Sequence, residues 1–327
     1  MKLRILLPAL LIFLAGCLDD TSGPSRTWTN DSPGVSFILP TIDNIWPNED
    51  QMRWSYAYTW DEDLFWSMVT YPDSNDVPPL PDWRKISDLL GTPLVGDSVV
   101  SAHGTYRMVF NGLATAGGGV TAQNLEESFE FNGSGAAPTV AMGSAEAEFL
   151  RRLHIARPDL ADKLPTALLA EEPGQSITAR DPLLIHGGVW EKTSEWIGTY
   201  GDLDDLLAWK FLTDRLRPGT EFTHQLIPSL ADDVYLHCRI VRELTVETKE
   251  GDFKKAIECL YLVDFGVSQT FNPGGAAEGY ARPIIYGSVI YAPTLGPVYC
   301  HERPLADTTD LIGASDMELT LDEFEEP

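Results

Sequence analysis

The chain has 327 residues, 43% of them hydrophobic, and a formal net charge of −26 at pH 7. This hydrophobic content is enough for a real core and excludes a disordered chain, while the length suits one large domain or two modest ones. So acidic a protein repels phosphates, which argues against nucleic-acid binding and against adhesion to anionic membranes. Solubility alone also explains such a charge.

The N-terminus has the pattern of a secretory leader. Lys2 and Arg4 supply two cations, and an apolar run follows over residues 5–13, broken only by Pro8. This run is too short to span a bilayer, which needs about 20 apolar residues. Residues 1–16 are therefore predicted to be a signal peptide that is removed.

The four residues that end this leader, Leu14-Ala15-Gly16-Cys17, resemble the lipobox of bacterial lipoproteins. The resemblance implies that cleavage falls just before Cys17, that this cysteine carries a lipid, and that the lipid fixes the protein to a membrane. Leu18 stands where the family uses Asp for inner-membrane retention, which implies an outer-membrane location in the cell envelope. The alternative is an ordinary secreted protein in which Cys17 is incidental.

Residues 17–40 contain many Ser, Thr, Gly and Pro residues and are predicted to form a lipidated tether. Beyond it, aromatic and β-branched residues dominate. Trp54, Tyr56 and Tyr58 alternate at period two and predict a strand with one aromatic face. Further strands are predicted at residues 98–112 and 121–133.

The middle of the chain has helical periodicity instead. Phe149, Leu150 and Leu153 form an apolar stripe within residues 144–171, and prolines interrupt it, so we expect two short helices with a turn between them. Another helix is predicted at residues 203–216, where leucines recur at helical spacing and a Pro-Gly pair follows. A helical insert is thus expected near residues 144–216.

The C-terminal third predicts two β-hairpins. Apolar residues alternate on both sides of a Lys-Glu-Gly turn at 249–251, and again on both sides of Pro-Thr-Leu-Gly at 293–296. The pattern predicts an α+β fold, with an antiparallel sheet and a few short helices inserted in the middle. Residues 41–305 are expected to form a single β-rich domain, and residues 306–327 a solvated acidic tail.

Three pieces of this third resemble a β-rich module of bacterial envelope lipoproteins whose role is unknown. They are RPGTEF (217–222), EGDFKKAIECLYL (250–262) and IYAPTLGPVYCHER (290–303), and IWPNEDQMRWSYAYTW (45–60) resembles the opening strand of the module. The resemblance implies a curved antiparallel sheet, loosely like the half-barrels of lipoprotein carriers that wrap a hydrophobic ligand. The module has no catalytic residue, so the resemblance assigns none here.

With Cys17 lipidated, an odd number of cysteines remains: Cys238, Cys259 and Cys300. A tight hairpin turn would place Cys238 opposite Val263, about 13 Å along the strand from Cys259, whereas a disulfide needs Cα atoms within about 7 Å. Cys238 and Cys259 are therefore interpreted as buried apolar residues. A bridge between Cys259 and Cys300 stays open as an alternative.

No metal or cofactor site is predicted. The pairs His237-Cys238 and Cys300-His301 invite a zinc interpretation, but adjacent residues on a strand point to opposite faces. The sequence also has no HExxH motif, no P-loop, no GxGxxG before a helix and no EF-hand loop.

Four tryptophans fall close together near the N-terminus: Trp46, Trp54, Trp60 and Trp66. They are interpreted either as core residues or as the lining of a ligand groove, because aromatic faces suit sugars, lipids and peptides.

Three hypotheses for the function follow. The first is a lipid-anchored, non-catalytic envelope protein that binds an apolar ligand or an envelope protein. The second is an envelope hydrolase that uses carboxylates such as Asp61, Glu62 and Asp63, without a site to which they can be assigned. The third is a purely structural surface lipoprotein.

Overall fold

The computed structural model describes residues 35–36, 38–63, 70–91, 100–116, 119–131, 149, 153, 157, 160, 182–200, 208–228, 230–271, 277–305 and 314–327. The predicted signal peptide, Cys17 and the tether up to residue 34 lie outside this part of the chain. So do nearly all residues of the two short helices predicted between 144 and 171.

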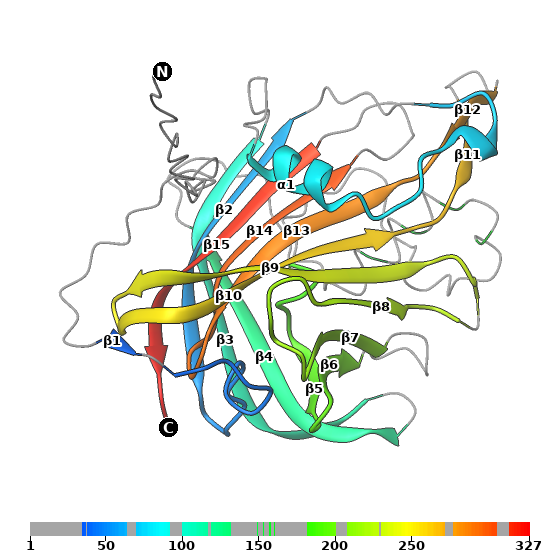
Figure 1. The fold of residues 1–327 in the computed structure, drawn as a ribbon. Helices are drawn as coiled ribbons and strands as arrows, with labels where there is room; N and C mark the ends of the chain where they lie inside the picture. The colour runs from blue at the N-terminus through cyan, green and yellow to red at the C-terminus, as the bar shows by residue number, and fades with distance from the viewer. Residues whose placement is uncertain are drawn as a thin grey trace, which may run out of the picture.

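Most of the described chain forms one 13-stranded sheet (Figure 1). Its strands are β1 Val35–Ser36, β2 Arg53–Asp63, β3 Val100–Thr115, β4 Thr121–Phe131, β5 Gly188–Lys192, β6 Trp196–Tyr200, β7 Ala208–Thr213, β8 Glu221–Gln225, β9 Tyr235–Thr248, β10 Gly251–Asp264, β13 Ile284–Ala292, β14 Gly296–Leu305 and β15 Ala314–Glu325. In space they follow the order β7-β6-β5-β4-β3-β2-β15-β14-β13-β10-β9-β8, and β1 pairs in parallel with β10. A separate two-stranded sheet consists of β11 Ser268–Phe271 and β12 Ala277–Ala281.

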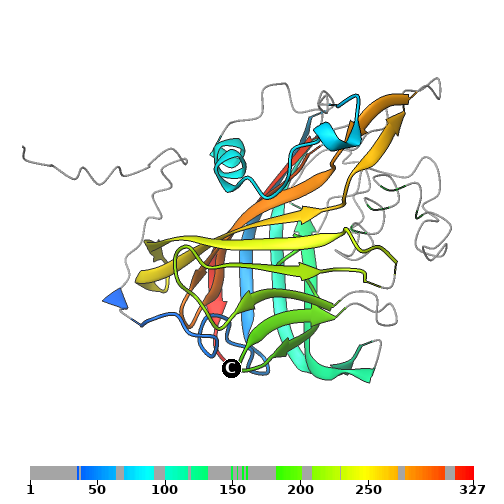
Figure 2. The ribbon, with the colours of Figure 1, turned by 45° about the vertical axis from the view of Figure 1, so that its right-hand side comes forward.

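The large sheet curls until its edge strands, β7 and β8, come into contact, so that it forms a nearly closed barrel (Figure 2). Strands twist relative to their neighbours in a fixed sense, and a sheet of this many strands therefore curls on itself. Side chains alternate along each strand between the inside of the barrel, here called the lumen, and its outer face. The predicted curved antiparallel sheet is thus confirmed, although it closes further than a half-barrel.

Both predicted hairpins are confirmed. β9 and β10 pair across a two-residue turn, with Thr248 opposite Gly251, and β13 and β14 pair with Ala292 opposite Gly296. Gly251 has a φ of 139° and Gly296 a φ of 83°, in a region of backbone conformation that favours glycine.

The aromatic strand near the N-terminus is also confirmed, as β2. Trp54, Tyr56 and Tyr58 all face the lumen and are buried. Trp54 Nε1 donates a hydrogen bond of 2.6 Å to Leu295 O, and Tyr56 OH donates one of 2.9 Å to Pro297 O. These two bonds tie β2 to the β13–β14 hairpin, on the far side of β15, one at its turn and one at the start of β14.

The helix predicted at residues 203–216 is wrong where the chain is described, because Ala208–Thr213 is strand β7 and pairs with β6. Trp209 and Phe211 alternate toward the lumen and are buried. The period-two pattern of these bulky residues outweighs the helical spacing of the leucines before them.

The acidic tail predicted at residues 306–327 is wrong as well, because it contains strand β15. This strand pairs with β14 on one side and with β2 on the other, so it lies in the middle of the sheet. Met317, Leu319 and Leu321 alternate into the lumen and are buried, while Glu318 and Thr320 between them face outward. The spacing of the apolar residues decides the structure here, and the charge does not.

One α-helix, α1 (Trp83–Gly91), lies on the outer face of the barrel against β10, β13 and β14 (Figure 1). Asp82 caps it, since its Oδ1 accepts a hydrogen bond of 3.2 Å from Lys85 N. A short 3-10 helix, η1 (Ser74–Asp76), precedes it. Among the described residues no helix is long and apolar enough to cross a membrane. The buried stripe of α1 consists of Trp83, Ile86 and Leu90.

Candidate functional site

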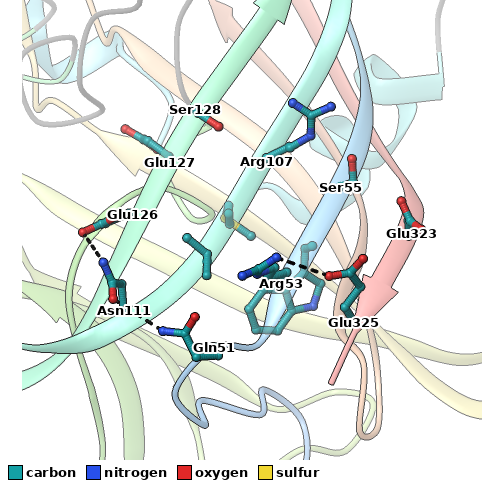
Figure 3. A pocket seen from close by; sticks show the side chains of 13 residues that line it. Gln51, Arg53, Ser55, Arg107, Asn111, Glu126, Glu127, Ser128, Glu323 and Glu325 are labelled. Carbon is teal, nitrogen blue, oxygen red and sulfur yellow. Dashed lines mark hydrogen bonds and ion pairs between the residues drawn. The ribbon is translucent and has the colours of Figure 1, made fainter. Parts of the chain in front are cut away.

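A groove of about 470 Å³ lies on the outer face of the barrel, across β15, β2, β3 and β4 (Figure 3). We call it the outer groove. The strand register arranges its side chains in two rows that run across the four strands. The first row is Glu325, Arg53, Val109 and Glu126, and the second is Glu323, Ser55, Arg107 and Ser128. These residues face outward because Trp54 and Met108, one position along each strand, face the lumen.

Two arginines occupy the middle strands of the outer groove, and acids occupy both sides. Arg53 Nη1 lies 3.6 Å from Glu325 Oε2, and Arg107 Nη1 lies 2.8 Å from Glu130 Oε1. The hydrogen bond between Arg107 and Glu130 raises the pKa of the arginine and lowers the pKa of the glutamate. All four side chains are about half exposed or more. A ligand can therefore replace one partner of either ion pair at little cost in free energy.

Amide side chains close one end of the outer groove. Asn111 Nδ2 donates a hydrogen bond of 2.9 Å to Glu126 Oε1, and Gln51 Nε2 lies 3.5 Å from Asn111 Oδ1 (Figure 3). Asp50 Oδ1 accepts a bond of 2.6 Å from Gly112 N, which fixes the loop before β2 against the end of β3. The groove therefore offers guanidinium, amide, hydroxyl and carboxylate groups to one ligand.

The carboxylates of the outer groove stand on its two outermost strands, β15 and β4. Glu126 and Glu325 stand on strands that are three sheet spacings apart, which is about 14 Å at about 4.8 Å per spacing. The two carboxyl groups of a glycoside hydrolase stand roughly 5–9.5 Å apart and flank the bond to be cleaved. Glu323 and Glu325 share one strand and one side of the groove.

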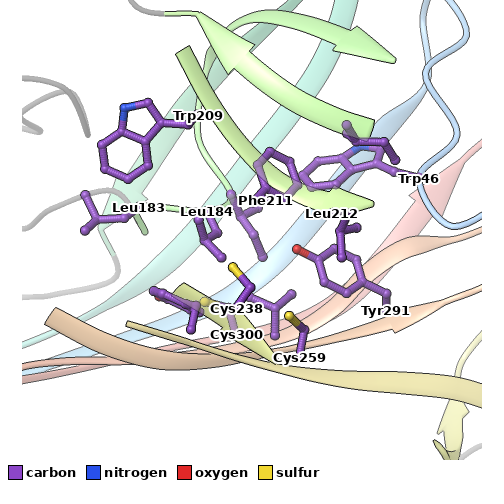
Figure 4. Packing of buried hydrophobic residues seen from close by; sticks show 14 of the residues in the cluster. Trp46, Leu183, Leu184, Trp209, Phe211, Leu212, Cys238, Cys259, Tyr291 and Cys300 are labelled. Carbon is purple, nitrogen blue, oxygen red and sulfur yellow. The ribbon is translucent and has the colours of Figure 1, made fainter. Parts of the chain in front are cut away.

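The lumen is occupied by the chain itself. Residues Leu183–Gly187, here called the lumen segment, lead into β5, and Leu183, Leu184 and Ile185 are at most 1% exposed. Figure 4 shows Leu183 and Leu184 among buried side chains of several strands. The apolar inner surface of the barrel is therefore covered by the protein's own residues in the described part.

Two carboxylates of the barrel wall bind the backbone of the lumen segment. Glu302 Oε2, on β14, accepts a hydrogen bond of 2.9 Å from Leu183 N and another from Tyr261 OH. Glu127 Oε2, on β4, accepts one of 2.7 Å from Gly187 N and one of 2.5 Å from Tyr106 OH. A side chain on Gly187 would collide with Glu127, since an added Cβ would lie 2.9 Å from its carboxyl carbon. Both ends of the segment are thus held.

His186 belongs to the same segment and is buried. Burial lowers the pKa of its imidazole, although the nearby charges of Glu127 and Glu302 act in the opposite direction. Its Nδ1 lies 2.6 Å from Gly187 O, and its own carbonyl accepts a bond of 3.0 Å from Trp190 Nε1. The imidazole therefore packs as a neutral group and is bonded locally.

Three of the four tryptophans proposed for a ligand groove lie in the core. Trp46, Trp54 and Trp60 are at most 3% exposed and belong to one hydrophobic cluster. Trp46 packs against Trp190 with ring centroids 4.2 Å apart, close to Phe211 and Tyr291 (Figure 4). Trp66 lies outside the described residues.

The three later cysteines are free and buried, as expected (Figure 4). The hairpin register differs from the prediction, because Cys238 stands opposite Tyr261 and not opposite Val263. Cys259 and Cys300 share one row across the sheet, with Val289 of β13 between them. Two sheet spacings, about 10 Å, separate these cysteines, which is too far for a disulfide.

The carboxylates considered for a hydrolase, Asp61, Glu62 and Asp63, form the last residues of β2, well beyond the outer groove. Asp61 stands opposite Asp316 of β15 in the register. Asp316 in turn binds Arg303, with 2.9 Å between its Oδ2 and Arg303 Nη2. Among the described residues no group of three or more His, Cys, Asp or Glu side chains is placed to hold a metal ion.

Sequence reasoning did not find the outer groove. Its residues come from β2, β3, β4 and β15, and only the register of the sheet brings them together. One signal was available: polar residues such as Arg53, Ser55 and Arg107 alternate with aromatic ones, which predicts a polar outer face without indicating a groove.

Comparison with known proteins yields no relative in sequence: no protein family matches the chain, and no curated protein matches it. Two solved structures show some similarity in shape. A candidate exported protein with a YmcC-like fold from Bacteroides fragilis has a TM-score of 0.34 at 9% identity, covering 86% of this chain and 99% of its own. A candidate lipoprotein from Parabacteroides distasonis has a TM-score of 0.23 at 10% identity, covering 86% and 98%. Structural similarity at these TM-scores and identities does not indicate a function for this chain.

Proposed function

We propose that the chain is a lipid-anchored, non-catalytic protein of the cell envelope, and that it binds an envelope protein through the outer groove. The anchor is the lipid on Cys17, and the outer membrane is the proposed location. The barrel acts as a rigid body that presents the groove to its partner.

The packing of the lumen carries this proposal. A carrier of apolar ligands needs an open apolar cavity, typically of about 300–1,000 Å³. Here Leu183, Leu184 and Ile185 occupy the lumen, and Glu127 and Glu302 hold the segment at both ends. A protein partner at the outer face is therefore favoured over an apolar ligand inside the barrel.

The chemistry of the outer groove supports binding without catalysis. Arg53 and Arg107 offer planar sets of donors, while Glu126, Glu323 and Glu325 offer acceptors. Exposed, exchangeable charges of both signs are typical of the polar rim of a protein interface. The wide separation of Glu126 from Glu325 supports the same conclusion.

The anchor is tested by Cys17→Ser, expressed in the native host. We expect the variant to leave the membrane pellet and appear in the soluble fraction, because it lacks the thiol that is lipidated. Mass spectrometry of the wild-type N-terminus should find a diacylglyceryl group on Cys17. A variant that still sediments with membranes, or a wild-type protein with an unmodified thiol, contradicts the anchor.

The partner site is tested by photo-crosslinking in intact cells. A p-benzoylphenylalanine at position 55, in the outer groove, should give a defined adduct, whereas the same residue at exposed Thr223 on β8 should give none. Arg107→Glu should reduce the adduct at position 55 at least fivefold, because it reverses the central charge of the groove. Equal adducts at positions 55 and 223, or none at either, contradict a binding role for the groove.

A further inference from the structure

The outer groove carries its charges in a regular order. Glu325 on β15, Arg53 on β2 and Glu126 on β4 share the first row, and they follow one another in this order across the sheet. Arg107, in the second row, stands on β3 as a diagonal neighbour of Arg53. The groove therefore has a positive middle between two negative sides (Figure 3).

The strand spacing gives the distances between these charges. Neighbouring strands stand about 4.8 Å apart, so the acids of β15 and β4 are separated by about 14 Å, and the middle of the groove lies about 7 Å from either acid. Diagonal neighbours in an antiparallel pair have Cα atoms about 7–8 Å apart. Arg53 and Arg107 can therefore both donate hydrogen bonds to one carboxylate that lies between them.

An extended polypeptide laid across the four strands has a matching period. Its side chains at positions i, i+2 and i+4 point to one face, and they are spaced by about 6.6 Å at about 3.3 Å per residue. The outer two are then about 13 Å apart. A cation at i, a carboxylate at i+2 and a cation at i+4 therefore meet the acid of β15, the two arginines and the acid of β4 in turn.

The charged groups of the groove are accessible to such a segment. The side chains of Arg53, Arg107 and Glu325 are each about half exposed, and their present ion pairs are easily exchanged. Glu126 is exposed, and its Oε1 accepts a hydrogen bond of 2.9 Å from the neutral amide of Asn111. This bond orients the carboxylate of Glu126 and leaves its charge in place.

The charge of the whole protein favours the same order. The formal net charge is −26, and four glutamates and only two arginines line the groove. A segment with a net positive charge is attracted to such a body, whereas a purely acidic segment is repelled by it. A cation on each side of the central carboxylate removes this repulsion and lets the carboxylate reach the arginines.

This chain does not itself contain the required order of charges. None of its 23 lysines and arginines is followed by an acid two residues later and by another cation four residues later. The order therefore selects a segment of a different polypeptide over a second copy of this chain.

We propose that the outer groove binds an extended segment of its partner that carries a cation, a carboxylate and a second cation at alternate positions, and that this segment lies across β15, β2, β3 and β4. The central carboxylate binds Arg53 and Arg107, and the two cations bind Glu325 and Glu126. This inference rests on the proposed function, which locates the partner at the outer groove without assigning the chemistry of the segment that binds there.

Two biotinylated peptides of equal composition test the order of charges. The first is Arg-Thr-Glu-Thr-Arg and the second is Glu-Thr-Arg-Thr-Arg, and threonine favours an extended backbone in both. Each is irradiated with the purified full-length protein that carries p-benzoylphenylalanine at position 55 of the groove. We expect at least fivefold more adduct with the first peptide. Equal adducts, or no adduct with either peptide, overturn the inference.

A reciprocal exchange of charge tests the contact with β4. Glu126→Lys should reduce the adduct with Arg-Thr-Glu-Thr-Arg at least fivefold, and the peptide Arg-Thr-Glu-Thr-Glu should restore at least half of it. Asp76→Lys makes the same change of charge at an exposed position of η1, outside the groove, and should leave the adduct unchanged. An equal loss in both variants, or no restoration by the exchanged peptide, overturns the inference.

The adduct formed in intact cells separates this inference from the proposed function. Mass spectrometry of the adduct at position 55 identifies the segment of the partner that is cross-linked. We expect cations at i and i+4 of this segment and an acid at i+2. A partner captured through a segment without this order overturns the inference and leaves the partner site in place. The absence of any adduct in cells contradicts the proposed function, and the inference fails with it.

Discussion

Two glutamates that face the inside of the barrel, Glu302 buried and Glu127 partly buried, accept hydrogen bonds from the backbone. Glu302 and Glu127 accept hydrogen bonds from the backbone nitrogens of Leu183 and Gly187. A buried N–H group without an acceptor costs roughly 1–3 kcal/mol, so each glutamate removes a penalty that the lumen segment would otherwise carry. The inward placement of these two glutamates therefore has a structural reason, and no catalytic role is needed to explain it.

Asp264, at the end of β10, is a buried acid of a different kind. Burial raises its pKa to about 6, although Arg282, 3.5 Å from its Oδ1, and the bond from Gly266 N act in the opposite direction. Asp233 adds to the increase, and Arg157 reduces it. Because the folded pKa lies above the ordinary value of 3.8, stability from this group is complete below about pH 3.8 and is lost as the pH rises through about 6.

The variant Asp264→Asn removes this loss and keeps an acceptor for Gly266 N. Measured by urea denaturation, the free energy of unfolding of the variant minus that of the wild type should be about 1 kcal/mol higher at pH 7.5 than at pH 5, which means that the variant gains relative stability as the pH rises. Ser87→Ala, at an exposed position of α1, removes no titratable group and should shift the free energy equally at both pH values. If the free energy of unfolding of Asp264→Asn differs from that of the wild type by the same amount at both pH values, the result contradicts a raised pKa for Asp264.

At the scale of elements, the hairpins and β2 could be predicted because turn residues and period-two alternation agree there. The capped helix α1 also had a signal: Asp82 followed by Trp83, Ile86 and Leu90 at helical spacing, with Gly91 at its end. The failures come from sequences in which two patterns compete. In β15 the acids suggested a solvated tail, whereas Met317, Leu319 and Leu321 have strand spacing. The position of the lumen segment could not be predicted, because it depends on contacts with distant strands.

Two substitutions on β15 distinguish a central strand from a solvated tail. Leu319→Ala should lower the free energy of unfolding by about 2–5 kcal/mol, because Leu319 is fully buried in the main cluster. Glu323→Ala, on the same strand but facing water, should change it by less than about 0.5 kcal/mol. In a solvated tail both changes would be small, so a small effect of Leu319→Ala would contradict the structure.

The whole molecule is held together without a disulfide among the described cysteines. A single hydrophobic cluster spans the barrel from Trp46 to Phe324, and the free thiols of Cys238, Cys259 and Cys300 are part of it. Burial raises the pKa of the Cys238 thiol, which keeps it in its unreactive form. The fold shields these three thiols from solvent.

Thiol labelling tests this arrangement. In the unreduced mature protein we expect no reaction of these three cysteines with a maleimide under native conditions and complete reaction of all three in urea. A sample reduced before unfolding serves as the control and should give the same count. Only one reactive thiol in the unreduced, unfolded protein would require a disulfide and contradict the strand register.

At the same scale, the outer groove depends on the register of four strands that are distant in sequence. β2, β3 and β4 belong to the first half of the chain, and β15 is its last strand. Composition and local periodicity predict which residues face outward. They do not tell which strand lies beside β2, so neither the groove nor the placement of Glu323 and Glu325 beside Arg53 could be predicted.

The position of β15 has a consequence for biogenesis. In the sheet, the block from β7 to β2 is joined to the block from β14 to β8 by the strand that is translated last. Until β15 pairs with them, β2 and β14 are open edges that can pair with other polypeptides. The barrel therefore cannot be completed before β15 is available, and a chain truncated before Ala314 would expose both edges permanently and be prone to aggregate.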